Sequence, residues 1–123
     1  MLMKGKKTLV LGASLKPDRY SNSAIHRLVN SNQEVVAIGL RSGEVAGITI
    51  HTFLTSFEDI HTVTLYLNPS RQKQYYDYII GLHPERVIFN PGTENPEFYN
   101  VLQEAGINVE VACTLVLLST NQY

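Results

Sequence analysis

The chain has 123 residues, of which 44% are hydrophobic and 17% are charged, and its formal net charge is −1. These values are typical of one globular domain and exclude intrinsic disorder as the dominant state. No run approaches the roughly 18 apolar residues of a membrane-spanning helix. The basic N-terminal stretch leads into an apolar run too short for a secretory signal, so we expect a cytoplasmic protein.

A single cysteine, Cys113, excludes an internal disulfide and a cysteine-based zinc cluster, and the four histidines lack metal-binding spacing. We therefore expect no metal site. The near-neutral charge argues against binding of nucleic acid or membranes by the chain as a whole. Residues 1–41 nevertheless carry seven basic and two acidic side chains, against three and nine in the remainder. This asymmetry indicates either a local anion site or an uneven solvated surface.

Five short apolar runs have the pattern of buried strands. Two of them end in glycine, and the last has β-branched residues at alternate positions. Between the second and third runs the pattern is less regular: 48–50 looks extended, and Ser56 with Asp59 favours a single helical turn. The predicted strands are, in chain order, 8–11, 35–38, 63–67, 87–89 and 107–111.

Helical patterns separate these strands. The first helix has Ser21 or Asn22 as its N-cap candidate. The next two begin with Asn-Pro pairs, in which asparagine caps the helix and proline is its first residue. The tyrosines at 75, 76 and 78 are expected to pack along a helix face. The predicted helices run from 21 or 22 to about 30, from 69 to 82, from 96 to 105 and from 113 to 118.

This alternation of strand and helix indicates a parallel sheet covered by helices, because parallel neighbours need crossover connections. We predict an α/β fold, a three-layer Rossmann-like doubly wound parallel sheet of about five strands, as a single domain over residues 1–123. Ligands of such sheets bind beyond the carboxyl ends of the strands. The loops to consider are therefore 12–21, 39–47, 67–70, 90–96 and 111–114.

The loop after the first strand has the composition of an anion site. It precedes a helix, whose free N–H groups bind phosphates, and it contains the hydroxyl of Ser14 and the cations Lys16 and Arg19. It is not a Gly-x-Gly-x-x-Gly loop, because only Gly12 is present. The alternative is an ordinary polar connection between a strand and a helix.

The loop after the second strand distinguishes between cofactors. NAD-binding folds place an acidic residue there for the ribose hydroxyls, whereas this chain has Gly39-Leu40-Arg41 and no acid before Glu44. Arg41 is suited to a ribose phosphate, as in NADP or coenzyme A. This position therefore argues against NAD.

Catalytic groups are few. The loop after the fourth strand offers Gly92, Thr93 and Glu94, which either contact a ligand or only cap the next helix. Glu94 is a candidate general base, but no second catalytic group accompanies it. Ser14 does not lie in a Gly-x-Ser-x-Gly elbow. Cys113 is either a small buried apolar residue or a thiol activated at a helix N-terminus, and a Tyr-x-x-x-Lys dyad is absent.

The segment Gly12-Ala13-Ser14, followed by Lys16-Pro17-Asp18-Arg19 and a helix, closely resembles the small stand-alone CoA-binding domain proteins of bacteria. These share their fold with the N-terminal CoA-binding domain of the succinyl-CoA synthetase alpha subunit. The resemblance covers nearly the whole chain, including 39–47, 90–94 and Ala112-Cys113. It departs at Asn68-Pro69, where the family often has an arginine or a small hydrophobic residue, and at Thr114, where a proline is usual.

The resemblance implies that the chain binds coenzyme A, an acyl-CoA or a related adenine nucleotide. It implies that Ala13, Ser14 and Lys16 line the phosphates, that Arg41 approaches the 3′-phosphoadenosine end and that 91–93 closes the pocket. It does not imply ligase activity, because the phosphohistidine domain of the synthetase has no counterpart here. The predicted cofactor-binding residues are Gly12, Ala13, Ser14, Lys16, Arg19, Arg41, Asn68, Pro91, Gly92 and Thr93.

Three functional hypotheses follow. The leading one is a binding module that holds coenzyme A or an acyl-CoA without catalysis of its own. The second is an enzyme, either an NADP-dependent oxidoreductase or an acyl transferase that uses Cys113. The missing catalytic dyad and substrate domain argue against the reductase. The third is the nucleotide-binding half of a larger complex, so assembly as a homodimer or with a partner subunit is left open.

Overall fold

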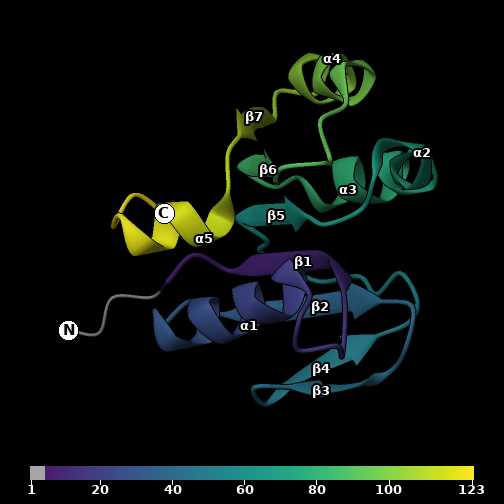
Figure 1. Cartoon of the computed structure of the whole chain (residues 1–123). Coiled ribbons are helices and arrows are strands. Elements are labelled where there is room, and N and C mark those ends of the chain that lie inside the picture. The colour runs from purple at the N-terminus through teal and green to yellow at the C-terminus, as the bar shows by residue number, and fades with distance from the viewer. Residues whose placement is uncertain (1–4) are drawn as a thin grey trace.

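The computed structural model describes residues 5–123 and shows a central sheet with helices on both faces (Figure 1). The strands are β1 (Thr8–Ala13), β2 (Val35–Gly39), β3 (Gly43–Val45), β4 (Ile48–His51), β5 (Thr62–Leu65), β6 (Arg86–Phe89) and β7 (Asn108–Val111). The helices are α1 (Tyr20–Asn30), α2 (Pro69–Gln72), the 3₁₀ turn η1 (Lys73–Tyr75), α3 (Tyr76–Leu82), α4 (Pro96–Glu104) and α5 (Thr114–Ser119).

The sheet has seven strands in the order β3-β4-β2-β1-β5-β6-β7, and only β3 runs antiparallel to its neighbour. The predicted α/β class and the five predicted strands are confirmed. The strand number of about five is too low, because β3 and β4 form an additional hairpin. Its edge strand buries only Val45, so it carries no apolar pattern, and Ala46 and Gly47 turn the chain with φ values of 51° and 79°.

The predicted helical turn at Ser56 and Asp59 is wrong, because the chain bends there without forming a helix. Asp59 has a φ of 59°, in the left-handed region that a right-handed helix excludes. The N-cap of α1 was also mispredicted. Arg19 occupies that position, whereas Ser21 and Asn22 lie inside the helix and are buried.

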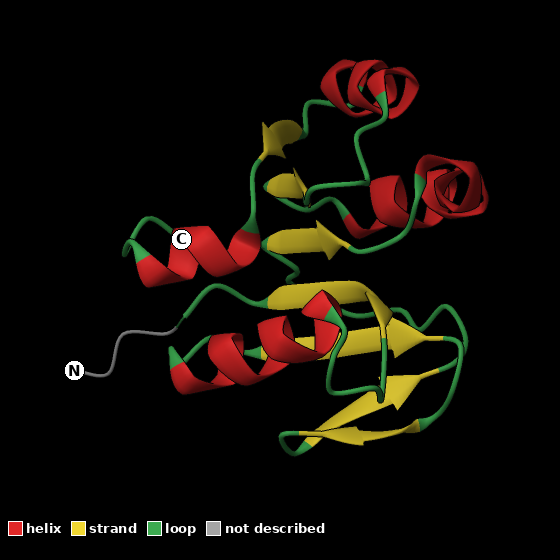
Figure 2. Cartoon of the chain, in the orientation of Figure 1, coloured by secondary structure: helices red, strands yellow, loops and turns green. Residues whose placement is uncertain are grey.

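The helices divide between the two faces of the sheet, as Figure 2 shows. Packed between the sheet and α1 with α5 are Val10, Ala37, Ile25, Leu28 and Leu118. The opposite face, under α3 and α4, is built from Leu9, Leu11, Val63, Phe89, Ile79, Phe98 and Leu102. Successive residues of β1 thus alternate between two cores, which explains why its sequence is continuously apolar.

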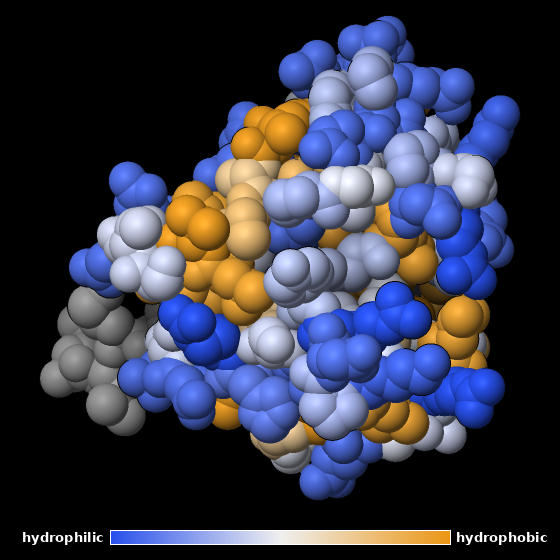
Figure 3. Space-filling model, viewed as in Figure 1, coloured by the Kyte–Doolittle hydropathy of each residue, from blue (hydrophilic) through white to orange (hydrophobic). Residues whose placement is uncertain are grey.

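The surface in the view of Figure 3 is largely hydrophilic, with hydrophobic side chains around β7 and α5. Val111 and Val116 are exposed there. Among residues 5–123, no helix combines the length and the apolar character needed to cross a membrane.

A β-bulge at Gly12 ends the regular part of β1. Gly12 has a φ of 96°, and the pairing register with β2 shifts between Leu11 and Ala13. As a result, Ala13 packs on the same face as Val10, instead of on the face of Leu9 and Leu11. The bulge therefore determines the direction in which the following loop leaves the sheet.

Gly39 ends β2 beside this bulge. A Cβ atom at this position would overlap the carbonyl oxygen of Ala13 and lie 3.0 Å from Ile50 Cγ2. We predict that Gly39→Ala lowers the free energy of unfolding by about 1–3 kcal/mol, because β1 and β2 must separate to accept the methyl group. Urea unfolding followed by circular dichroism measures this change.

Gly81→Ala in α3 is the matched control. A Cβ atom there meets nothing within 4 Å, so this variant should be neutral or more stable by up to about 1 kcal/mol. Equal unfolding free energies for the two variants would contradict the close packing of β1 on β2.

Candidate functional site

A cavity lies at the carboxyl ends of the central strands. β1 continues into α1 on one face of the sheet, whereas its neighbour β5 continues into α2 and α3 toward the other face. The loops after these two strands diverge, and a crevice of about 550 Å³ opens between them. This is the topological switch point, where doubly wound sheets bind ligands.

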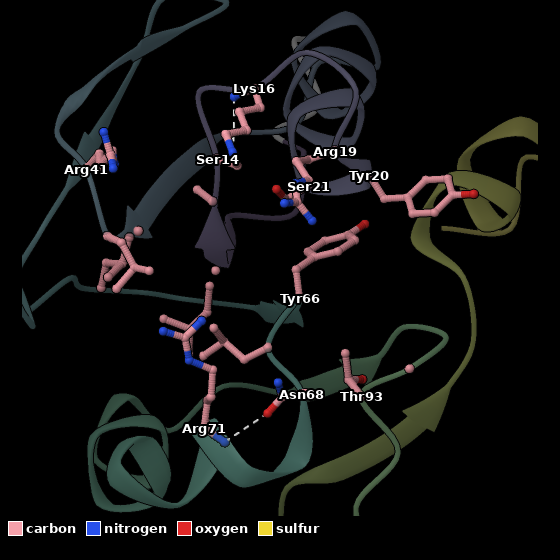
Figure 4. A pocket seen from close by; sticks show the side chains of 18 of the residues that line it. Ser14, Lys16, Arg19, Tyr20, Ser21, Arg41, Tyr66, Asn68, Arg71 and Thr93 are labelled. Atoms are coloured by element: carbon pink, nitrogen blue, oxygen red, sulfur yellow. Dashed lines mark hydrogen bonds between the residues drawn. The ribbon is translucent and has the colours of Figure 1, made fainter.

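The loops after β1, β2, β5 and β6 all contribute to the cavity lining. The loops after β4 and β7 also follow the carboxyl ends of strands, but they do not line the cavity. All ten residues predicted from the sequence lie in the lining, namely Gly12, Ala13, Ser14, Lys16, Arg19, Arg41, Asn68, Pro91, Gly92 and Thr93. The structure thus brings together four segments that are far apart in the sequence (Figure 4).

Several lining residues were missed by the sequence prediction. Arg71 is the most consequential, because it adds a cation from the first turn of α2. The Asn68-Pro69 pair correctly indicated that a helix begins there. The sequence did not indicate on which side of the sheet the first turn of this helix lies, so Arg71 was not assigned to the site. Tyr75 was expected only to pack, yet it also borders the cavity. The other missed residues include Leu15, Tyr20, Leu40 and Tyr66.

The loop after β1 is held in place by short local contacts. The Ser14 hydroxyl accepts a hydrogen bond from the backbone N–H of Lys16 at 3.1 Å, and the Asn22 amide donates to the Ser14 carbonyl at 3.0 Å. Burial of Asn22 inside α1 therefore serves to tie the loop to the helix. This arrangement places Ser14, Lys16 and Arg19 together on one side of the cavity (Figure 4).

The N-terminus of α1 faces this loop. Its N-cap residue, Arg19, makes no side-chain hydrogen bond to the first turn, and that turn contains no acidic residue. The helix has 11 residues, so its dipole adds a partial positive charge at the cavity. Free N–H groups and this charge together suit a bound anion.

The cavity is strongly positive. Of the residues that the structure describes, Lys16, Arg19, Arg41 and Arg71 line it, and no acidic side chain does. The two ion pairs found among residues 5–123, Lys7 with Glu34 and Arg86 with Glu110, leave all four of these cations uncompensated. Low-dielectric walls concentrate such a field and raise the local concentration of an anionic ligand.

A buried glutamine joins two of the segments that line the cavity. Gln72 is fully buried, and its amide donates hydrogen bonds to the carbonyl oxygens of Leu67 at 2.8 Å and Thr93 at 2.7 Å. Its own carbonyl accepts a hydrogen bond from Asn95 at 2.9 Å. The turn that carries Asn68 and the loop that carries Thr93 therefore form one rigid unit.

Asn90 extends this unit to the C-terminal helix. Its amide donates to Thr64 Oγ1 at 2.7 Å and to the Leu65 carbonyl at 2.9 Å, and its Oδ1 accepts from the Thr114 N–H at 2.8 Å. The Thr93 hydroxyl donates to the Asn90 carbonyl at 2.7 Å. These bonds explain why Asn90 and Thr114 are buried although polar.

The candidate catalytic groups lie outside the lining. The Glu94 carboxylate accepts a hydrogen bond from the Gly92 N–H at 2.8 Å, so it stabilises its own loop. Cys113 is half-buried at the N-cap of α5, and its thiol does not line the cavity either. Within the lining, burial raises the pKa of Tyr66 to about 12, which keeps its phenol neutral. The lining of this cavity includes no Asp, Glu, His or Cys side chain.

A family model described as the CoA-binding domain matches residues 6–119. The chain belongs to this family. The resemblance noted in the sequence is therefore confirmed over nearly the whole chain.

Solved structures share the fold of this chain. An uncharacterized protein shares 45% identity with a TM-score of 0.95, and the alignment covers 98% of this chain and 100% of that one. A hypothetical protein from Pyrococcus horikoshii OT3 shares 27% identity with a TM-score of 0.84 over 94% of this chain and 83% of that one. A protein from Thermus thermophilus, at 24% identity and a TM-score of 0.84 over 97% and 91%, shows the fold alone. The comparison with curated proteins finds no match.

We predict that Gln72→Leu lowers the free energy of unfolding by at least about 2 kcal/mol, because it leaves the carbonyls of Leu67 and Thr93 and the Asn95 amide short of partners. Chemical unfolding measures the loss. Gln103→Leu, at an exposed position on α4, is the control and should change stability by less than about 0.5 kcal/mol. A Gln72 variant as stable as this control would show that the bridge between the segments after β5 and β6 is dispensable.

Proposed function

We propose that this protein is a binding module that holds coenzyme A or an acyl-CoA in the cavity at the switch point. One observation carries the proposal: in a member of the CoA-binding domain family, four uncompensated cations and no acid line that cavity. Coenzyme A carries three phosphate groups, so it matches this charge pattern.

The ligand is proposed to lie across the edge of the sheet. Its diphosphate binds the loop after β1 and the N-terminus of α1, beside Ser14, Lys16 and Arg19. Arg41, in the loop after β2, pairs with the 3′-phosphate. Leu15 and Leu40 are more than a third exposed and border this region, so they offer apolar surface to the adenine ring.

The other wall closes the pocket. Pro91, Gly92 and Thr93 follow β6, and Asn68 follows β5. Gly92 has a φ of 92° and a Cβ atom there would meet nothing within 4 Å, so its surroundings are open. The backbone of this loop can therefore contact an extended ligand closely.

The lining offers hydroxyls, cations and apolar side chains, which are groups that bind phosphates and an adenine ring. The proposal therefore assigns binding to this cavity and no reaction. NADP is the alternative ligand, because Arg41 is equally suited to a 2′-phosphate. NAD fits less well, because the residues from the end of β2 that line the cavity include no acid.

A thermal-shift series distinguishes these ligands. We predict that coenzyme A and acetyl-CoA raise the unfolding midpoint, since a ligand that binds only the folded state stabilises it by mass action. 3′-Dephospho-CoA should raise it less, because it lacks the partner of Arg41. A shift with NADP alone would replace coenzyme A by NADP in this proposal, and no shift with any of these ligands would contradict it.

The phosphate contacts are tested by Lys16→Ala and Arg41→Ala. Each variant should weaken coenzyme A binding by about tenfold or more, since a hydrogen bond to a charged group contributes roughly 1.5–3 kcal/mol. Titration calorimetry measures the affinity. Both side chains are exposed, so stability should stay within about 0.5 kcal/mol of the parent.

Arg27→Ala is the matched control, because Arg27 is an exposed cation on α1 that does not line the cavity. It should bind coenzyme A as the parent does. If the Lys16 and Arg41 variants also bind like the parent, the placement of the phosphates is wrong.

A further inference from the structure

We propose that Arg71 acts as a clamp from the second wall and makes the site select a diphosphate over a single phosphate. This inference rests on the proposed function, because it assigns a role within the same cavity. It concerns a residue that the sequence analysis did not assign to the site. It also predicts a preference for two linked phosphates, which the proposed roles of the other three cations do not predict.

The position of Arg71 is the first observation. Lys16 and Arg19 belong to the loop after β1, whereas Arg71 comes from α2, after β5, on the other side of the crevice. In Figure 4 the Arg71 side chain rises from α2 into the cavity, toward the side that carries Ser14 and Lys16. An anion in the crevice therefore has cations on two opposite sides.

The second observation is the rigidity of the turn beneath Arg71. Asn68 caps this turn, and its Oδ1 accepts hydrogen bonds from the Arg71 N–H at 3.2 Å and the Ser70 hydroxyl at 2.6 Å. The next residue, Gln72, is fully buried and bonded to the loops at Leu67 and Thr93. The backbone of Arg71 is thus fixed, and only its side chain is free to move.

The third observation is that the Arg71 guanidinium has no competing partner. None of the side-chain hydrogen bonds or ion pairs found in residues 5–123 involves its guanidinium, and no acid lines the cavity. A guanidinium presents a planar set of donors that matches phosphate oxygens in a bidentate manner. Its free donors are directed at the space between the two walls.

From these observations we expect the site to select ligands with two linked phosphates. One phosphate at the N-terminus of α1 is satisfied by the N–H groups and by Lys16 or Arg19. A second phosphate, linked to the first, extends across the crevice and meets Arg71 from the other wall. The contribution of Arg71 is therefore made only when both phosphates are present.

The experiment compares ADP with AMP on the complete chain by titration calorimetry. The parent should bind ADP at least about tenfold more tightly than AMP, which corresponds to one charge-assisted contact. Arg71→Gln should reduce this ratio to near one, and Arg71→Lys should give an intermediate ratio because charge remains without the planar fork. Lys73→Gln removes an exposed neighbouring cation outside the lining and should keep the parent ratio.

Coenzyme A and 3′-dephospho-CoA separate this role from that of Arg41. Arg41→Gln should lose the preference for coenzyme A over 3′-dephospho-CoA but keep the preference for ADP over AMP. If Arg71→Gln keeps the ADP preference, or loses only the 3′-phosphate preference, the clamp is refuted. Failure of the parent to bind coenzyme A while it still discriminates ADP from AMP would overturn the proposed function and leave the clamp standing.

Discussion

The site depends on the close approach of β1 to β5 at Gly12. The left-handed conformation of this residue produces the bulge, and a Cβ atom there would lie 3.0 Å from the carbonyl of Tyr66. Because the bulge turns Ala13 toward the α1 face, the loop after β1 leaves the sheet on the opposite side from α2. The crevice between the two loops is the consequence, and the cations that line it follow from the residues that these loops carry.

The second wall has a different physical basis. It is formed from the segments after β5 and β6, which are joined by the buried amides of Gln72 and Asn90. A buried amide is costly unless its hydrogen bonds are made, so these two residues fix one arrangement of their loops. A preorganised wall loses little conformational freedom when a ligand binds, and this suits a protein whose proposed task is to hold a molecule.

The general position of the site could be predicted from the sequence because it follows from topology. Alternating apolar runs and helices indicate a parallel sheet, and the carboxyl ends of its strands then locate Ser14, Lys16 and Arg41. Arg71 and Gln72 could not be found in this way, because their roles depend on which loops meet in space. The extended segment expected at 48–50 is confirmed as β4. Its partner β3 was missed because this edge strand buries a single side chain, so the pattern of a strand is absent.

The central claim is that coenzyme A binds between these two walls. It is tested most directly by nuclear magnetic resonance titration of the ¹⁵N-labelled protein with coenzyme A. We predict that the backbone amide signals of the non-proline residues in 12–21, 39–41, 67–72 and 91–93 shift. Those of the non-proline residues in 83–85 and 105–108, which line a smaller cavity, should not shift. Shifts confined to residues outside the four loops, or no shift at millimolar ligand, would contradict the account.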